Sequence, residues 1–135
     1  MKKVLFVCGG NVGRSQMAQM FLKKLHPEYE VSSAGFNVSI PGQRIGDKEE
    51  AKDVIRAMRE EGVDMSDNTR TVFDPSMLAD FDVVVILEKE SKIPDYIKAN
   101  KKLIFWDIVD PYKMGYEVSA VVRDQIKGLV VEGFK

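Results

Sequence analysis

The stretch VLFVCGGNVGRSQMAQ, residues 4–19, joins an apolar run, a glycine-rich turn and the start of a helical pattern. The run before Cys8 is short and uninterrupted, which predicts a strand buried on both faces. After the turn, Met17, Phe21 and Leu25 recur at helical spacing. Because ligands bind beyond the carboxyl ends of strands in open α/β sheets, we expect Cys8, the only cysteine, at a binding edge.

The same alternation of strand and helix signals extends along the chain. Strand-like runs occur at residues 3–8, 29–35, 81–87 and 101–106, and helical spacing occurs at residues 14–27, 51–62 and 118–130, with a weaker helix within residues 88–100 that Pro94 interrupts. Residues 36–47 contain Pro41, Gly42 and Gly46 without a clear period, which predicts a loop. Alternating elements predict a parallel sheet with helices on both faces. We therefore predict one three-layer α/β domain over residues 1–135.

Composition excludes several classes of protein. The formal net charge of −1 and the lack of a basic cluster argue against nucleic-acid binding. The apolar run after Lys2 and Lys3 is too short for a signal peptide, and no segment has the ~18–20 apolar residues that span a bilayer. A single cysteine excludes an internal disulfide and fits a reducing compartment. We expect a cytoplasmic protein without membrane or nucleic-acid partners, cofactor or metal.

The turn after Cys8 has the chemistry of an oxyanion site. Its backbone N–H groups can converge, and the following helix adds free N–H groups and the positive end of its dipole. This field favours the Cys8 thiolate, which is the nucleophilic form. Arg14 can fork onto two oxygens of the anion, and Ser15 can donate its hydroxyl to the thiolate. The predicted phosphate-binding residues are Gly9, Gly10, Asn11, Val12, Gly13, Arg14 and Ser15; Asn11 also tolerates left-handed backbone angles.

Two other interpretations of this turn stay open on the residues alone. A lone cysteine at the end of a strand is often an inert packing residue. The segment from Cys8 to Ser15 also has the length of a nucleotide P-loop, with Gly13 and Ser15 in register. However, Cys8 replaces the first glycine of that motif and Arg14 replaces its lysine, and no acidic residue suited to Mg²⁺ follows a strand convincingly.

The whole stretch Cys8-Gly9-Gly10-Asn11-Val12-Gly13-Arg14-Ser15 resembles the C-x-G-N-x-x-R-S signature of low-molecular-weight protein tyrosine phosphatases and of their arsenate reductase relatives. The resemblance continues in MA at residues 17–18, SSAG at 32–35, EEGVDMS at 60–66, FDVVVIL at 81–87 and VDPY at 109–112. We expect the strand order 2-1-3-4 in the four-stranded sheet.

The leaving group of a phosphoryl transfer needs an acid. Asp110 follows the fourth predicted strand in a loop stiffened by proline, and the resemblance assigns the acid and base to this Asp-Pro position. Asp107 is a neighbouring candidate without the proline. His26, the sole histidine, lies at the far end of the first helix and is interpreted as a surface or capping residue.

Other residues bear on substrate choice. Relatives grip a phosphotyrosine ring with aromatic side chains; here the expected wall is Tyr112, Phe36 and Ile40, with Tyr116 assisting. Arg44, Lys48 and Lys113 are candidates for attracting anionic substrates. These assignments follow from the resemblance and from the position of each residue in the sequence.

Gly13 stands where many phosphatases of this family carry a second cysteine, and thioredoxin-coupled arsenate reductases of this fold use two further cysteines that are absent here. The prediction is a phosphatase that forms a phosphocysteine intermediate on phosphotyrosine proteins or small aryl phosphates, with inorganic phosphate as product and inhibitor. The alternatives are an arsenate reductase that uses an external small thiol, and an oxyanion-binding domain without turnover.

Overall fold

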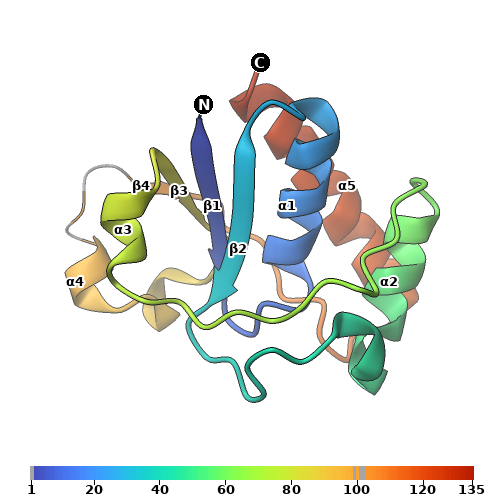
Figure 1. Cartoon of the computed structure of the whole chain (residues 1–135). Coiled ribbons are helices and arrows are strands. Elements are labelled where there is room, and N and C mark those ends of the chain that lie inside the picture. Colours follow the sequence, from blue (N-terminus) through green and yellow to red (C-terminus); the bar gives the residue numbers. More distant parts are fainter. Residues whose placement is uncertain (1, 99, 101–102) are drawn as a thin grey trace.

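The computed structural model describes residues 2–98, 100 and 103–135, which form one α/β domain (Figure 1). Helices and strands alternate along the chain, as the sequence pattern predicts. Their bounds are β1 (Lys3–Cys8), α1 (Arg14–Leu25), β2 (Glu30–Gly35), η1 (Ile45–Asp47), η2 (Glu49–Ala51), α2 (Lys52–Arg59), α3 (Met77–Asp80), β3 (Val83–Ile86), η3 (Glu90–Lys92), α4 (Asp95–Lys98), β4 (Leu103–Phe105) and α5 (Tyr116–Gly133).

The four strands are parallel and lie in the order β2-β1-β3-β4, which confirms the predicted order. The first strand is central, and its residues from Val4 to Cys8 are all buried, as expected of a short unbroken apolar run. Cys8 is opposite Gly35 of β2, and Val7 is opposite Ile86 of β3. This register brings the carboxyl ends of three adjacent strands to one level.

The two faces of the sheet bury different sets of side chains. Val4, Phe6 and Cys8 of β1 pack with residues of α1, α2 and α5, whereas Leu5 and Val7 belong to a second cluster. That second cluster also includes side chains of α3 and α4. The predicted three layers are therefore present. In Figure 1 the long helices α1 and α5 lie on one side of the sheet, with the short helices α3 and α4 on the other.

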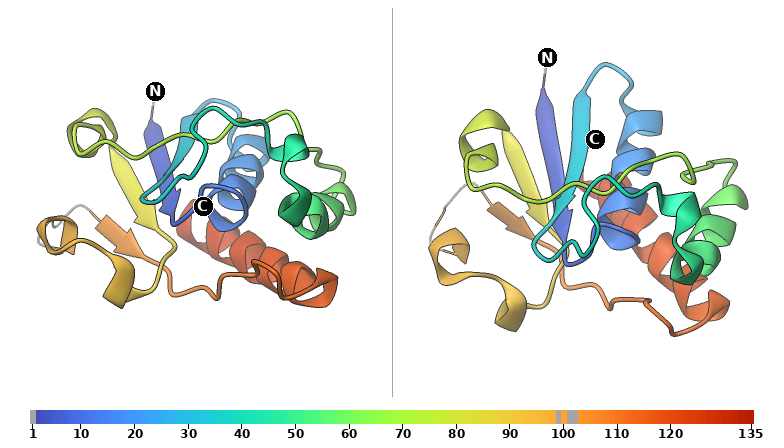
Figure 2. Two further views of the ribbon diagram at one scale, coloured as in Figure 1. Left: turned by 90° about the horizontal axis from the view of Figure 1, so that it is seen from below. Right: turned by 60° about the horizontal axis from the view of Figure 1, so that its bottom comes forward.

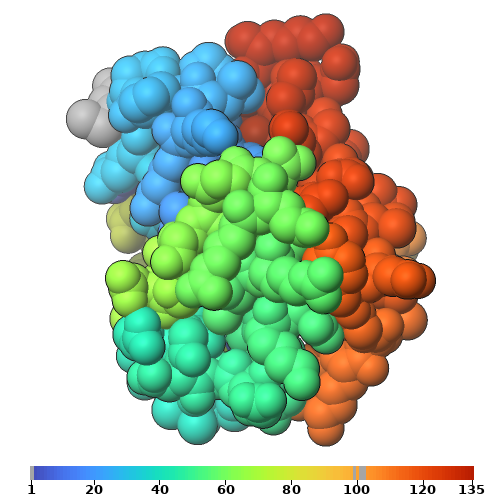
Figure 3. All heavy atoms as spheres, turned by 90° about the vertical axis from the view of Figure 1, so that its right-hand side faces the viewer, coloured from blue at the N-terminus to red at the C-terminus, as the bar shows by residue number. Residues whose placement is uncertain are grey.

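Helix α2 covers the outer side of the layer that α1 and α5 form. Val54, Ile55 and Met58 are buried on one face of this helix, which confirms its predicted amphipathic pattern. Figure 3 shows the green segment that contains α2 lying between the blue of α1 and the red of α5. This segment separates the layer below it from solvent on that side.

Several predicted elements differ in detail. The terminal helix does not bury all of its valines: Val121 is 58% exposed, because it falls outside the buried stripe of Val122, Ile126 and Val130. The weak helix within residues 88–100 is divided at Pro94 into η3 and α4. The fourth strand is described only from Leu103, since residues 101 and 102 lie outside the described part of the chain. The short helix α3 was not predicted.

Two views from the lower end of the molecule show the carboxyl ends of the strands with loops gathered around them (Figure 2). The predicted loop of residues 36–47 crosses below β1 and β2 and contains only the single turn η1 near its end. No helix in the described ranges is long and apolar enough to cross a bilayer.

Candidate active site

Cys8 ends the central strand, and the turn of residues 8–15, which we call the cradle loop, follows it directly. The Cys8 side chain is only 2% exposed, and its Sγ lies 3.0 Å from Ser15 Oγ at the start of α1. Backbone bonds from Phe36 N–H to Cys8 O and from Asn37 N–H to Gly9 O fix the beginning of the loop against the chain after β2. The sulfur is thus held beside a hydroxyl group at a helix N-terminus.

Asn11 holds the middle of the cradle loop in shape. Its φ of 56° lies in the left-handed region, which asparagine tolerates better than most residues. The fully buried side chain donates to Ser15 Oγ at 2.8 Å and to Ser33 Oγ at 3.0 Å, and its Oδ1 accepts a bond from Thr71 N–H. Asn11 therefore orients the Ser15 hydroxyl that contacts Cys8, and connects the loop to two other segments.

Two glycines permit close approaches that a side chain would block. A Cβ at Gly35 would lie 2.6 Å from Gly9 O and 2.9 Å from Asn11 N, so β2 can lie against the cradle loop only without one. A Cβ at Gly9 would lie 2.7 Å from Glu88 Oε2. Gly35 is therefore required by its contact with backbone atoms, whereas a side chain at Gly9 would have to displace the Glu88 carboxylate.

Arg14 is held in place by a buried carboxylate. Its Nη1 and Nη2 donate to the two oxygens of Glu88 at 3.1 and 3.2 Å, and Nη1 also donates to Ile108 O at 3.1 Å. A guanidinium has five N–H donors. Within the described part of the chain these bonds leave the Nε–H and one Nη2–H for an anion, and two such donors suit two phosphoryl oxygens.

The electrostatics keep both members of this pair ionised. Burial lowers the pKa of Arg14, but the charges of Cys8, Glu88 and Asp110 outweigh it and raise the pKa above its ordinary value. Burial raises the pKa of Glu88, but hydrogen bonds from Arg14 and from Lys89 N–H outweigh it and lower the pKa below its ordinary range. The pair is therefore an ionised, hydrogen-bonded unit.

Asp110 lies on the loop after β4, and its Oδ2 is 3.6 Å from Arg14 Nη2. Its Oδ1 accepts a bond from Tyr112 N–H at 3.1 Å, which fixes the carboxylate over the Pro111 turn. The side chain is 51% exposed, in contrast to Arg14, and so remains open to solvent. This arrangement places a solvent-accessible carboxylate on the open side of the cradle loop.

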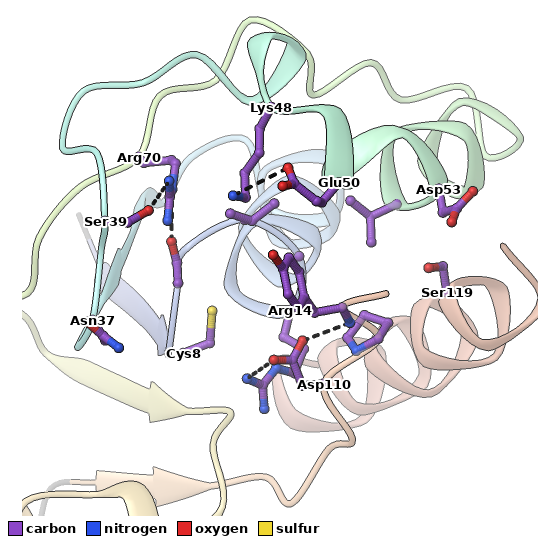
Figure 4. A pocket seen from close by; sticks show the side chains of 16 residues that line it. Cys8, Arg14, Asn37, Ser39, Lys48, Glu50, Asp53, Arg70, Asp110 and Ser119 are labelled. Atoms are coloured by element: carbon purple, nitrogen blue, oxygen red, sulfur yellow. Dashed lines mark hydrogen bonds and ion pairs between the residues drawn. The ribbon is translucent and has the colours of Figure 1, made fainter. Parts of the chain in front are cut away.

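A cleft of about 310 Å³ opens in front of the sulfur (Figure 4). Cys8 points into it, with Arg70 to one side and Asp110 to the other, while Asp53 and Ser119 lie at one end. The lining residues are Cys8, Gly10, Val12, Gly13, Arg14, Asn37, Ser39, Lys48, Glu50, Asp53, Val54, Arg70, Asp110, Pro111, Tyr112 and Ser119. The volume suits a small-molecule site.

Of the predicted aromatic wall, only Tyr112 lines this cleft. Phe36 packs edge-on against Phe73, with ring centroids 5.1 Å apart, in the core on the other face of the sheet. Ile40 is 54% exposed on the loop and does not line the cleft. Tyr116 donates instead to Glu60, directly after α2. The structure therefore does not bring these three residues to the cleft: Phe36 and Tyr116 contact partners that are distant in sequence, and Ile40 faces solvent.

The predicted cations divide in the same way. Lys48 lines the cleft, 3.6 Å from Glu50 and 5.7 Å from the Tyr112 ring centroid, and Lys113 also lies over that ring at 5.3 Å. Arg44 is paired with two aspartates on the surface, outside the cleft. The predicted attraction of anionic substrates can therefore involve Lys48, while Arg44 is occupied elsewhere.

Two residues set aside in the sequence lie away from the cleft. His26 contacts Phe134 O and Glu28 at the far end of α1. Asp107 lines a separate hollow with Phe105. In the described residues no three histidine, cysteine, aspartate or glutamate side chains are grouped as metal ligands.

Glu88 and Arg70, two charged residues that contact the cradle loop or its arginine, were missed in the sequence. Glu88 lies two residues after the end of β3, and a carboxylate after a buried parallel strand is a signal that could have indicated it. Arg70 lies between α2 and α3, in a segment without a clear period, and nothing in the sequence associates it with the cradle loop. Both residues reach the loop only through long-range folding.

The sequence model of the family described as low molecular weight phosphotyrosine protein phosphatase matches residues 3–132. The chain belongs to this family. The matched range includes the cradle loop, Glu88 and Asp110.

Proteins similar to this chain have names that refer to different activities. Arsenate reductase 2 of Staphylococcus haemolyticus is 34% identical over 137 residues, which cover 99% of this chain and 96% of the relative. An arsenate reductase solved in the phosphate binding state is 33% identical with a TM-score of 0.76, covering 98% of this chain and 95% of that one. Wzb of Vibrio vulnificus in complex with benzylphosphonate has a TM-score of 0.81 at 23% identity, covering 98% and 96%.

Proposed function

We propose that this protein is a cysteine-dependent phosphatase that hydrolyses phosphotyrosine or small aryl phosphate monoesters through a phosphocysteine intermediate. The observation that carries this proposal is the arrangement around one sulfur. Cys8 Sγ contacts the Ser15 hydroxyl, Arg14 keeps two donors for the anion, and the Asp110 carboxylate lies beside Arg14 on the open side.

In the first step, the Cys8 thiolate attacks phosphorus in line and the P–O bond to the leaving group breaks. The N–H groups of the cradle loop and Arg14 bind the equatorial oxygens, so that charge in the transition state meets donors already in place. Protonated Asp110 gives its proton to the departing oxygen, which leaves as the alcohol or phenol.

In the second step, the Asp110 carboxylate takes a proton from a water molecule, and this water attacks the phosphorus. The S–P bond breaks, inorganic phosphate leaves and the Cys8 thiolate is regenerated. Ser15 Oγ, 3.0 Å from the sulfur, donates to the departing thiolate and makes it a better leaving group. Inorganic phosphate is the product and fits the same cradle loop as an inhibitor.

The aryl substrate is supported by the walls of the cleft. Tyr112 is 45% exposed and lines the cleft with Val12, Val54 and Pro111, which together offer apolar surface beside the anion site. Offset or edge-on contact between Tyr112 and a substrate ring would add to the affinity. A reducing compartment such as the cytoplasm would keep the single thiol active.

A second candidate function is arsenate reduction, which the names of the relatives at 33–34% identity favour. Reduction of arsenate to arsenite takes two electrons, and two thiols supply them by forming a disulfide. This chain has one cysteine. The reductase would therefore need an external small thiol to attack the Cys8 adduct, whereas phosphate ester hydrolysis needs only water. The cysteine count supports the phosphatase.

One set of assays separates the candidates. We expect wild type to hydrolyse p-nitrophenyl phosphate, Cys8→Ser to have no activity, and Asp110→Asn to retain a small fraction of it. Arsenate consumption is measured in parallel with glutathione as the thiol. Turnover of arsenate alone would support the reductase and overturn the proposal. Phosphate binding by calorimetry without either turnover would identify a binding domain.

A further inference from the structure

Arg70 is a second arginine at the cleft, and its guanidinium is built into the rim. The residue is only 4% exposed. Its Nε donates to Gly10 O at 3.1 Å, and its Nη1 donates to Ser39 Oγ at 3.1 Å and to Gln43 Oε1 at 2.9 Å. These bonds connect the cradle loop to the loop of residues 36–47.

Among the described residues, the hydrogen bonds of this guanidinium go to neutral groups. In the part of the chain that the structure describes, no carboxylate forms a salt bridge with Arg70, and all three of its bonds go to neutral oxygens. Buried charges in proteins are normally paired, because desolvation is costly. Burial lowers the pKa of Arg70 below its ordinary value, although the more distant charges of Cys8, Glu50 and Tyr112 oppose this.

The two other cations that line the cleft, Arg14 and Lys48, are already paired with carboxylates. Arg14 has Glu88 as a forked partner, and Lys48 lies 3.6 Å from Glu50. Arg44, on the same loop as Ser39, is paired with Asp47 and Asp67. Among the described residues that line the cleft, Arg70 is therefore the buried cation without a carboxylate partner, and a ligand would supply one.

The unused donors of Arg70 lie beside the anion site. No bond involves Nη2 among the described residues, and this atom is 3.6 Å from the position that a Gly10 Cβ would take. The C=O and N–H of one trans peptide point in opposite directions. The peptide that contains Gly10 O also contains the Asn11 N–H. The Arg70 guanidinium, which binds Gly10 O, therefore lies on the opposite side of this peptide from the Asn11 N–H and flanks the cradle loop. Figure 4 shows Arg70 with Ser39 on the wall opposite Asp110.

We propose that Arg70 binds a second anionic group of the substrate, a carboxylate adjacent to the phosphoryl group, so that the preferred substrate is a phosphotyrosine flanked by acidic residues. This inference rests on the proposed phosphatase function. A substrate carboxylate would accept hydrogen bonds from the two N–H groups of Arg70 Nη2, or from one of them and from the Ser39 hydroxyl. It would also supply the counter-ion for the guanidinium. Selectivity for acidic sequences then comes from one residue outside the cradle loop.

The turnover test uses two phosphotyrosine peptides that carry either glutamate or glutamine on both sides of the phosphotyrosine. We expect wild type to have a kcat/KM about fivefold higher for the acidic peptide, the size of one partly exposed charged contact. Arg70→Gln should bring the two peptides within about twofold of each other, and Arg70→Lys should keep part of the preference. Arg44→Gln, a paired arginine on the neighbouring loop, is the matched control and should keep all of it.

A binding test does not depend on turnover. Propylphosphonate and 3-phosphonopropionate differ in that a carboxylate replaces the terminal methyl group, and their protection of Cys8 from iodoacetamide measures affinity. Wild type should bind the carboxylate compound about fivefold more tightly and Arg70→Gln should not, with both variants checked for folding by circular dichroism. Inorganic phosphate should protect wild type and Arg70→Gln at similar concentrations.

The outcomes separate this inference from the function on which it rests. The role of Arg70 is overturned if wild type shows the same kcat/KM for both peptides and the same affinity for both phosphonates. It is also overturned if the preference for the acidic compound persists in Arg70→Gln. An equal loss of affinity for both phosphonates and for phosphate would make Arg70 a brace of the cradle loop only, which also overturns it. If neither peptide is hydrolysed but the phosphonate preference follows Arg70, the anion subsite stands and the phosphatase proposal fails.

Discussion

Arg14 and Glu88 face each other as a buried forked pair, with the two guanidinium Nη atoms 3.1 and 3.2 Å from the two carboxylate oxygens. Such a pair fixes a planar group in one orientation. Glu88 directs the Nε–H and the remaining Nη2–H of Arg14 away from itself. The consequence is that the arginine expected to clasp the anion is aligned before the anion arrives, and that it is aligned by a residue outside the signature motif.

Replacing Glu88 by alanine should therefore lower both activity and stability. The change leaves a buried guanidinium with only the more exposed Asp110 beside it, and should cost about 3 kcal/mol in the free energy of unfolding. We expect kcat/KM for p-nitrophenyl phosphate to fall with it. Glu90→Ala, a change at an exposed neighbour, is the control for urea unfolding and kinetics. Unchanged activity in Glu88→Ala would contradict the alignment role.

The stability contributed by Glu88 should depend on pH. The pKa of Glu88 in the folded protein lies below its ordinary value, so its contribution is fully present above the unfolded pKa of about 4.3. It is lost as the pH falls through the folded pKa. We expect the difference in unfolding free energy between wild type and Glu88→Gln to stay constant from about pH 7 to 5 and to shrink in more acidic buffer. If the difference in unfolding free energy instead grew as the pH fell, the pKa of Glu88 would be raised on folding, which would contradict this prediction.

Gly35→Ala tests the contact between β2 and the cradle loop. The new Cβ would lie 2.6 Å from Gly9 O and 2.9 Å from Asn11 N, both backbone atoms, so the loop must shift. We expect a loss of about 1–3 kcal/mol in stability, together with weaker inhibition by inorganic phosphate. Gly128→Ala is the matched control: nothing lies within 4 Å of its Cβ on α5, and it should stabilise the protein by about 1 kcal/mol. Thermal unfolding and phosphate inhibition measure both effects.

Asp110→Asn should slow turnover by about 10²–10⁴-fold for phenyl phosphate, whose leaving group needs a proton. The loss should be smaller for p-nitrophenyl phosphate, because p-nitrophenolate leaves without one. Asp107→Asn is the control, since Asp107 lies outside the cleft. Equal losses for both esters would argue against Asp110 as the acid.

The single cysteine predicts the response to peroxide. Oxidised Cys8 has no second thiol in the chain to form a rescuing disulfide, so prolonged treatment should carry it past the sulfenic acid to irreversible acids. Mass spectrometry should show added oxygen atoms on the peptide containing Cys8, and dithiothreitol should not restore activity. Bound phosphate should slow the reaction. Full recovery with thiol after long treatment would contradict this prediction.

The sequence predicted those features that depend on neighbouring residues. The apolar run of β1, the turn after it and the α1 pattern are local, and the position of Cys8 at the carboxyl edge follows from them. Alternating strands and helices were enough for the parallel sheet, and the strand order followed from the family resemblance. Short elements such as α3 have too little periodicity to be recognised, and Val121 shows that a valine on a terminal helix need not be buried.

The parts that were missed depend on contacts between distant segments. Glu88 meets Arg14 across 74 positions and Arg70 meets Gly10 across 60. Phe36 was expected beside the substrate, but its position after β2 turns it toward Phe73 in the core of the other face. A local pattern carries no information on such pairings, since they are decided by how strands and loops pack together.

Parts of the site follow each of the four parallel strands in turn: Cys8 at the end of β1, Gly35 at the end of β2, Glu88 after β3 and Asp110 after β4. Cys8 and Gly35 end their strands and Glu88 lies two residues after β3, whereas Arg70 and the Asp110–Tyr112 turn belong to longer connecting segments. Substitutions in the connecting segments, at Arg70 or Tyr112, would therefore change the preferred substrate and leave the residues at the strand ends unchanged. A relative of this protein could acquire a new substrate without any change at Cys8 or Arg14.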